Sequence, residues 1–302
     1  MPNTTFPTAD PVNSYRLGLI LVTAAAVAWS TAGLFTRMID TDTGTMLFWR
    51  GVFGGAGILA VSCAVQGRGA FGAFARLGRA GWAFAVISAL GMLCFITGLR
   101  ITTVAHVAII YATVPLVAAA LGWLVLRERL GRGALTASLA ALGGVTVMVG
   151  WGGDGTFAGD VLAFGMTLAL AAMMVISRRL PGLPIMAASA LSAVLSALAA
   201  LPFAQELAVS GDDLALLALF GLVNSALGLA LFSLGARYLP AVETALITAL
   251  DAPLAPVWVW IVFSETPSAA TLAGGGIVFA AVMVHLWRQN RRRVSSPRPS
   301  AP

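Results

Sequence analysis

The sequence predicts an all-α membrane protein: ten transmembrane helices arranged as two inverted five-helix repeats. The composition, the length of the apolar runs and an internal repeat carry this prediction. Of the 302 residues, 59% are hydrophobic and 10% are charged, which is too little charge for a soluble domain of this size. The apolar runs are long and continuous, without the alternation of barrel strands, so the spans are expected to be helices.

The ten expected spans are runs of roughly 20 apolar residues, the length that crosses about 30 Å of hydrocarbon as a helix. The connections between them are short, which leaves no room for a soluble domain. Any function is therefore expected within the membrane. The runs lie at about residues 17–38, 44–66, 81–99, 103–125, 133–151, 158–177, 184–204, 214–236, 241–263 and 268–287.

The internal repeat relates residues 88–147 to residues 225–284 at an offset of 137. Without a gap, 17 of the 60 paired positions are identical, where this composition gives roughly five by chance. Five helices per repeat is an odd number, so the second copy must enter the membrane from the opposite side. We expect a first repeat at 17–151 and a second at 158–287, as in many secondary transporters. Rare residues coincide in three pairs: Arg100 with Arg237, Trp123 with Trp260, and Glu128 with Glu265.

The basic residues are all arginines, and 15 of the 18 fall at one end of the expected spans. By the positive-inside rule both termini are predicted to be cytoplasmic, in a multi-pass protein of a bacterial inner membrane. Residues 1–16 are expected to be an N-terminal tail, and residues 288–302 a basic, disordered tail at the lipid headgroups. A nucleic-acid partner is not expected, because the basic residues do not form a soluble face.

Several motifs resemble the drug/metabolite transporter superfamily of the EamA type. Residues 29–33 read Trp-Ser-Thr-Ala-Gly, and a glutamate closes the fourth and the ninth span. The resemblance implies export of small metabolites, such as amino acids or amphipathic drug-like solutes, in exchange for protons. In that family the glutamate is followed by a glycine in the next span and then by Gly-Val. Glu128 is followed instead by Ala137 but keeps Gly144 with Val145, whereas Glu265 keeps Gly274 but is followed by Ala281 with Val282.

Asp251 lies about ten residues into the ninth span, where a charge costs about 2.5 to 3.5 kcal/mol. It is expected to bind a proton or a substrate amine, or else to be packed as a neutral or paired acid. Thr244, Thr248 and Asp251 follow helical spacing and are expected to form one polar face toward a cavity.

The prolines of the fourth and ninth spans, Pro115 and Pro253, remove helical hydrogen bonds and are candidate gating hinges, or packing features. His106 and Glu243 occupy matching repeat positions at the starts of these spans. They are further gate candidates, or ordinary interfacial groups.

Arg50 is the only cation well inside an apolar run. It could bind a substrate carboxylate, pair with Asp251, or extend to the headgroups beside Trp49. An aromatic and polar pocket for a flat or amphipathic solute could be formed by Trp29 with Ser30, Tyr111, Asn224 and Trp258. The alternative for each of these is packing. Small-residue spacing predicts close helix contacts at Gly51, Gly55, Gly274, Gly275 and Gly276.

No residue pattern indicates an enzyme, a metal site or a cofactor, and with only two histidines and two cysteines catalysis has few groups to use. The sequence therefore predicts a secondary transporter, and the resemblance implies an exporter, whose partners are a small organic solute, protons and the lipid bilayer. The alternatives are an uptake permease of the same fold and a membrane scaffold or sensor without transport. The substrate and the oligomeric state are left open.

Overall fold

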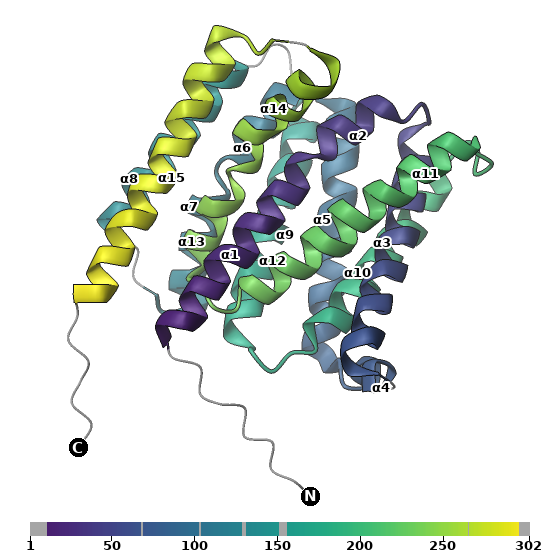
Figure 1. Cartoon of the computed structure of the whole chain (residues 1–302), viewed down its shortest axis with the longest axis horizontal. Coiled ribbons are helices and arrows are strands. Elements are labelled where there is room, and N and C mark those ends of the chain that lie inside the picture. Colours follow the sequence, from purple (N-terminus) through teal and green to yellow (C-terminus); the bar gives the residue numbers. More distant parts are fainter. Residues whose placement is uncertain are drawn as a thin grey trace, which may run out of the picture.

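The structure is a computed structural model that describes residues 11–67, 69–102, 104–128, 131–150, 156–264 and 266–295. Within these residues every regular element is a helix (Figure 1). Ten helical segments are long and apolar enough to cross a membrane, which confirms the predicted number and fold class.

The first five spans are built from eight helical segments. The first span is α1 (Pro11–Ser30) with α2 (Ala32–Met38), the second is α3 (Thr43–Gln66), and α4 (Gly69–Ala75) is a short connection. The third span is α5 (Gly78–Ile101) and the fifth is α8 (Arg132–Val149). The fourth span combines α6 (Val104–Tyr111), α7 (Val114–Leu121) and the π-helical η1 (Gly122–Leu126).

The last five spans are divided differently. The sixth is α9 (Phe157–Arg179), the seventh is α10 (Ile185–Ala200) with η2 (Leu201–Phe203), and the tenth is α15 (Ala269–Ser295). The eighth combines α11 (Gly211–Phe220), the π-helical η3 (Gly221–Gly228) and α12 (Leu229–Gly235). The ninth combines α13 (Ala241–Thr248) with α14 (Asp251–Phe263).

The two repeats are inverted relative to each other. Helix α1 begins and α15 ends at the same end of the bundle (Figure 1), called the terminal end below; the opposite end is called the far end. Because each repeat has five spans, the second repeat starts from the far end. Equivalent spans pack against each other across the repeats, as α3 does with α10, α7 with α13, and α8 with α15.

The fourth and ninth spans are broken at equivalent positions. The breaks at residues 112–113 and 249–250 are separated by the same 137 residues as the sequence repeat. Pro115 and Pro253 follow the breaks and have no N–H to donate to the carbonyl four residues earlier. Tighter turns form instead, with Thr113 N donating to Ile110 O over 3.0 Å and Leu250 N to Ile247 O over 3.1 Å. Discontinuous helices at matching positions of two repeats are typical of transporter binding sites.

Glycines set the closest helix contacts. A Cβ on Gly144 would lie 2.8 Å from the carbonyl oxygen of Gly274, so α8 and α15 touch backbone to backbone. A Cβ on Gly51 would lie 2.7 Å from the carbonyl oxygen of Ala193, where α3 crosses α10. The predicted contacts are also found at Gly55 and Gly275. The prediction is wrong for Gly276, where a Cβ would meet no atom within 4 Å among the described residues.

The tails differ from the expectation. Helix α15 continues to Ser295, so residues 288–295 are helical rather than disordered, and α1 already begins at Pro11. Arginine and glutamine are good helix formers, and positive charge near a helix C-terminus is favoured by the helix dipole. The guanidinium of Arg291 also lies 3.9 Å from the ring centroid of Trp287. The remaining residues of both predicted tails lie outside the described part.

Candidate functional site

A cavity of about 590 Å³ lies between the two repeats at the level of the helix breaks. Apolar and sulfur-containing side chains such as Met92, Phe95, Met166 and Met173 form much of its wall. Polar side chains are few, which is typical of a site for a small organic molecule. The lining includes six of the nine residues predicted to bind a ligand: Trp29, Ser30, Arg50, Tyr111, Asn224 and Asp251.

The carboxylate of the cavity belongs to Asp251, the first residue of α14. Its Oδ2 accepts a hydrogen bond of 3.3 Å from the hydroxyl of Tyr111, the last residue of α6. Its Oδ1 is buried and has no hydrogen-bond partner among the described residues. The break places Asp251 at a helix N-terminus, where the helix dipole favours negative charge. One oxygen is therefore left to accept a proton or an ammonium group.

The cation of the cavity is Arg50, half-buried in α3. Its Nη2 donates to Oδ1 of Asn224 over 2.8 Å, and its Nη1 contacts Sδ of Met92 at 3.2 Å. Its guanidinium carbon lies 5.2 Å from the ring centroid of Phe220. In the described part of the chain it has no ion-pair partner. Arg50 thus neither pairs with Asp251 nor extends to the headgroups, and its Nε is buried without a partner.

Asn224 links Arg50 to the break in the first span. It lies in the π-helical η3, a local widening that is frequent at functional sites. Its Nδ2 lies 3.3 Å from the main-chain carbonyl oxygens of both Ala28 and Trp29. The main-chain carbonyl of Asn224 accepts a hydrogen bond from Trp29 Nε1 over 3.1 Å. With only one amide oxygen, Asn224 satisfies a single donor of Arg50.

The α1–α2 break is held by short side chains that bond to their own helix. Ser30 Oγ donates to the carbonyl of Val27 over 2.7 Å, and Thr31 Oγ1 to that of Ala28 over 2.6 Å. Ser30 Oγ also accepts from Trp258 Nε1 over 2.8 Å. Trp258 thus connects the first span to α14 by a hydrogen bond. It does not line the cavity, contrary to the prediction.

Thr244 and Thr248 do not share a face with Asp251, contrary to the sequence expectation. Both are buried, and their hydroxyls donate to carbonyls of their own helix, Thr244 to Pro240 and Thr248 to Ala245. The helix ends after Thr248 and restarts at Asp251, so helical spacing does not carry across the gap. Neither threonine lines the cavity.

The gate candidates are found in different settings. Pro115 and Pro253 adjoin the breaks, as described above. Glu243 is buried at the terminal end, where it accepts hydrogen bonds from Tyr15 over 2.7 Å and from Gln289 over 2.9 Å. His106 belongs to α6, but its side chain lies outside the described residues.

The terminal end of the cavity is closed. A buried apolar cluster fills this half of the bundle and includes Phe84, Val114, Ala118, Met174 and Phe232. Toward the far end the lining reaches the exposed Thr36. The cavity is therefore closed by packing toward the terminal end, while its lining extends toward the far end.

A polar cluster accompanies this closure, with one contact between the repeats, from Arg178 to Glu128, and two within the second repeat. The sequence did not predict a role for it. Arg178 Nε lies 3.3 Å from Oε1 of Glu128, and Arg178 Nη1 donates to the carbonyl of Arg237 over 3.3 Å. Arg237 in turn donates to the carbonyl of Leu183 over 3.3 Å. The signal that could have found this cluster is the repeat, because both Glu128 and Arg237 are among its rare coinciding residues.

Comparisons of this chain with known protein families and solved structures agree with this architecture. The model of the EamA-like transporter family matches twice, at residues 16–150 and 157–287. A solved structure titled only "Crystal structure of protein" has a TM-score of 0.80 at 17% identity, covering 92% of this chain and 99% of that chain. At this identity the likeness shows the fold alone. A search of curated proteins finds no match.

Proposed function

Because the chain belongs to the EamA-like transporter family, we propose that it is a secondary transporter that exports a small organic solute by alternating access. The observation that carries the proposal is the cavity between the repeats, which combines one cation and one carboxylate with an apolar wall. A membrane-embedded cavity of this size accepts a small molecule and excludes a macromolecule.

The preferred solute is a zwitterion with an apolar side chain, such as an apolar amino acid. Arg50 has an unpartnered Nε as well as the donors it offers to Asn224 and Met92, so it can bind a carboxylate. Asp251 has an unpartnered oxygen for the ammonium group. The methionines of the wall suit side chains of different shape, because methionine is flexible and polarisable.

Asp251 is also the proposed coupling group. A substrate ammonium and a proton would compete for the same carboxylate, so that solute and proton occupy the site in turn. This exchange needs no nucleotide and no cofactor. Since the arginines gather at the terminal end, the termini are assigned to the cytoplasm of a bacterial inner membrane. The described conformation then faces outward, the state in which an exporter releases its solute.

The test begins with the purified protein and a thermal-shift screen of apolar amino acids and of cationic amphiphiles. A solute that binds only the folded state raises the melting temperature. The solute found is then followed in proteoliposomes with an imposed pH gradient. We expect gradient-driven flux from the unaltered protein and loss of the pH dependence with Asp251→Asn. Arg50→Gln is expected to weaken solute binding by roughly ten-fold or more, the effect of losing a charged hydrogen bond.

The matched control is Asp212→Asn, which removes an exposed acid at the start of α11. It should leave flux and pH dependence unchanged. Flux with unchanged pH dependence in Asp251→Asn would remove that residue from coupling. Absence of flux for every stabilising solute would favour the scaffold alternative, and solute accumulation in overexpressing cells would favour uptake over export.

A further inference from the structure

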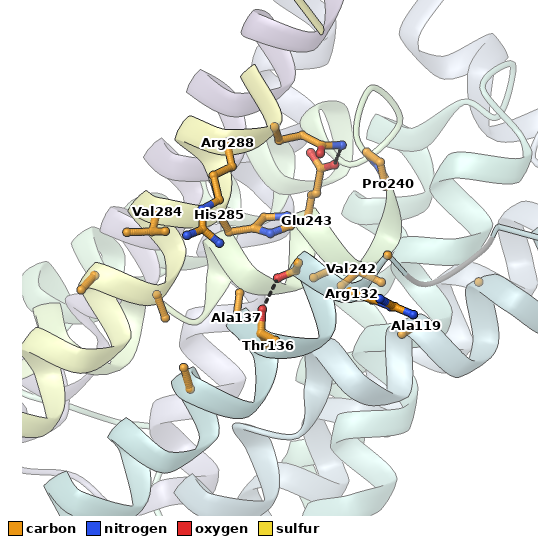
Figure 2. Close-up of a pocket in the computed structure, with 18 of the residues that line it drawn as sticks. Ala119, Arg132, Thr136, Ala137, Pro240, Val242, Glu243, Val284, His285 and Arg288 are labelled. Atoms are coloured by element: carbon orange, nitrogen blue, oxygen red, sulfur yellow. Dashed lines mark hydrogen bonds between the residues drawn. The ribbon is translucent and has the colours of Figure 1, made fainter. Parts of the chain in front are cut away.

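A second pocket, of about 1100 Å³, lies between α8 and α15 at the terminal end of the bundle (Figure 2). An apolar cluster separates it from the central cavity. Ala137 belongs both to this cluster and to the pocket wall, while Ala108 packs against the cluster from the side of the central cavity. The fully buried Leu246 lies in the same cluster. The pocket is therefore distinct from the candidate transport site.

The pocket opens where α8 and α15 diverge. The two helices touch at Gly144 and Gly274, and the pocket occupies the terminal side of that contact. Its wall there is apolar and made of small residues, with the flanking Leu139 and Met283 exposed as on a lipid-facing surface. The apolar residues that α8 and α15 contribute to this wall include Ala137, Ala140, Ile277, Ala280, Ala281 and Val284.

The rim of the pocket is positively charged. Arg132 and Arg288 line it from α8 and α15, and neither guanidinium has a hydrogen-bond or ion-pair partner in the described part of the chain. The two carboxylates of the lining are already occupied. Glu128 is paired with Arg178 at 3.3 Å, and both oxygens of Glu243 accept hydrogen bonds, from Tyr15 and from Gln289.

The N-terminus of α8 adds to this positive potential. Gly131, its N-cap residue, has no side chain to cap the helix, whereas Asp42, Thr156 and Ser210 cap α3, α9 and α11. Residues 131–134 line the pocket, so the uncapped N–H groups lie beside it. An uncapped helix N-terminus next to an arginine is suited to a phosphate group.

The buried imidazole of His285 is an independent observation that indicates a ligand in this pocket. Its side chain projects from α15 into the pocket beside Glu243 (Figure 2). The residue is only 8% exposed, and its Nε2 has no hydrogen-bond partner among the described residues. A buried polar atom without a partner is costly, and a phosphate oxygen can accept its hydrogen.

We propose that this pocket binds an anionic phospholipid from the leaflet at the terminal end. The phosphate lies between Arg132, Arg288 and the N-terminus of α8, and one acyl chain lies against the small apolar residues of α8 and α15. The apolar wall favours a lipid over a free phosphate, because a soluble anion would leave that wall unused. The proposal does not depend on the transported solute.

The experiment measures lipid binding to the full-length protein in detergent by native mass spectrometry and by thermal shift. Dioleoyl-phosphatidylglycerol is titrated against the unaltered protein, the Arg132→Gln/Arg288→Gln variant and the Ala280→Trp variant. The first variant removes the charge, and the second fills the exposed apolar wall while keeping the charge. We expect at least five-fold weaker binding with either variant.

The matched control is Arg76→Gln/Arg79→Gln, which removes the same charge from exposed positions at the terminal end, near α4 and the start of α5. It should bind phosphatidylglycerol like the unaltered protein. Equal weakening by control and pocket variants would indicate non-specific attraction and overturn the proposal. Equal stabilisation by glycerol phosphate would also overturn it, in favour of a soluble anion. Dioleoyl-phosphatidylcholine should bind more weakly, and equal affinity for it would contradict the charge argument.

Discussion

The hydroxyl of Tyr111 donates a hydrogen bond of 3.3 Å to Oδ2 of Asp251 and joins the broken ends of two equivalent spans. Tyr111 ends α6 in the first repeat, and Asp251 begins α14 in the second. The contact therefore connects the one carboxylate of the cavity to the opposite half of the protein. Movement of the repeats against each other changes the surroundings of that carboxylate.

A double-mutant cycle of Tyr111→Phe and Asp251→Asn should measure this connection. Because the bond is long and part-buried, we expect a coupling free energy of about 1 kcal/mol. Denaturant unfolding in mixed micelles provides the measurement. Tyr238→Phe, paired with Asp251→Asn, is the control and should be additive. Additivity within about 0.3 kcal/mol for Tyr111→Phe as well would contradict the contact.

Glu128→Gln should loosen the closure of the terminal end. The ion pair with Arg178 is partly exposed, with side-chain exposures of 32% and 34%, so it contributes at most about 1 kcal/mol, or roughly five-fold in population. A thiol introduced by Ala118→Cys, in a background without Cys63 and Cys94, reports on the sealed half. We expect its labelling by a maleimide to speed up by up to about five-fold. Asp212→Asn should leave the labelling rate unchanged, and no change with Glu128→Gln would show that the ion pair does not hold the closure.

Gly144→Leu should disrupt the crossing of α8 and α15. A Cβ at this position already meets the carbonyl oxygen of Gly274 at 2.8 Å, so a larger side chain must push the helices apart. Overpacking of this kind costs about 1–3 kcal/mol, measured as a lower unfolding midpoint in detergent. The neighbouring Gly143→Leu is the control, since a Cβ there meets no described atom within 4 Å. Equal effects of both changes would refute the close contact.

Asp42→Ala should destabilise the far end in a pH-dependent way. Partial burial acts to raise the pKa of the Asp42 carboxyl, but hydrogen bonds from the Thr45 hydroxyl and from the N–H groups of Thr45, Gln205 and Gly44 outweigh it and lower the pKa below 3.8. A lowered pKa gives stability that is present at neutral pH and is lost as the pH falls through the folded-state pKa.

We therefore expect the variant to be less stable by about 1 kcal/mol at pH 7, the usual effect of losing an N-cap. The difference should shrink as the pH is lowered below 3.8. Unfolding midpoints measured between pH 3 and pH 7 test this expectation. The control is Asp212→Ala, at an exposed acid, which should leave the unfolding midpoint unchanged across this pH range. Asp213 is unsuitable because it takes part in the cap of α11. A pH-independent difference for Asp42→Ala would count against the lowered pKa.

Much of the candidate site could be predicted from single residues in the sequence. Asp251 and Arg50 stood out because charge is rare inside apolar runs, and both line the cavity. The stripe of Thr244, Thr248 and Asp251 failed because it assumed an unbroken helix. Pro253 indicated a break in the helix, but the helical spacing from Thr244 to Asp251 was assumed to continue across that break. The partner of Arg50 was also missed, since the choice between Asp251, the headgroups and Asn224 depends on how three helices are rotated.

The sequence by itself determined the ten spans, the repeat and its inversion, because hydrophobic length and self-similarity are properties of the chain that need no partner. Tertiary structure alone decided which polar groups meet. A buried polar side chain bonds to the nearest donor or acceptor, and that choice is made by helix rotation, by the breaks before Pro115 and Pro253, and by the widened turn at Asn224. These are fixed only when the two repeats pack together.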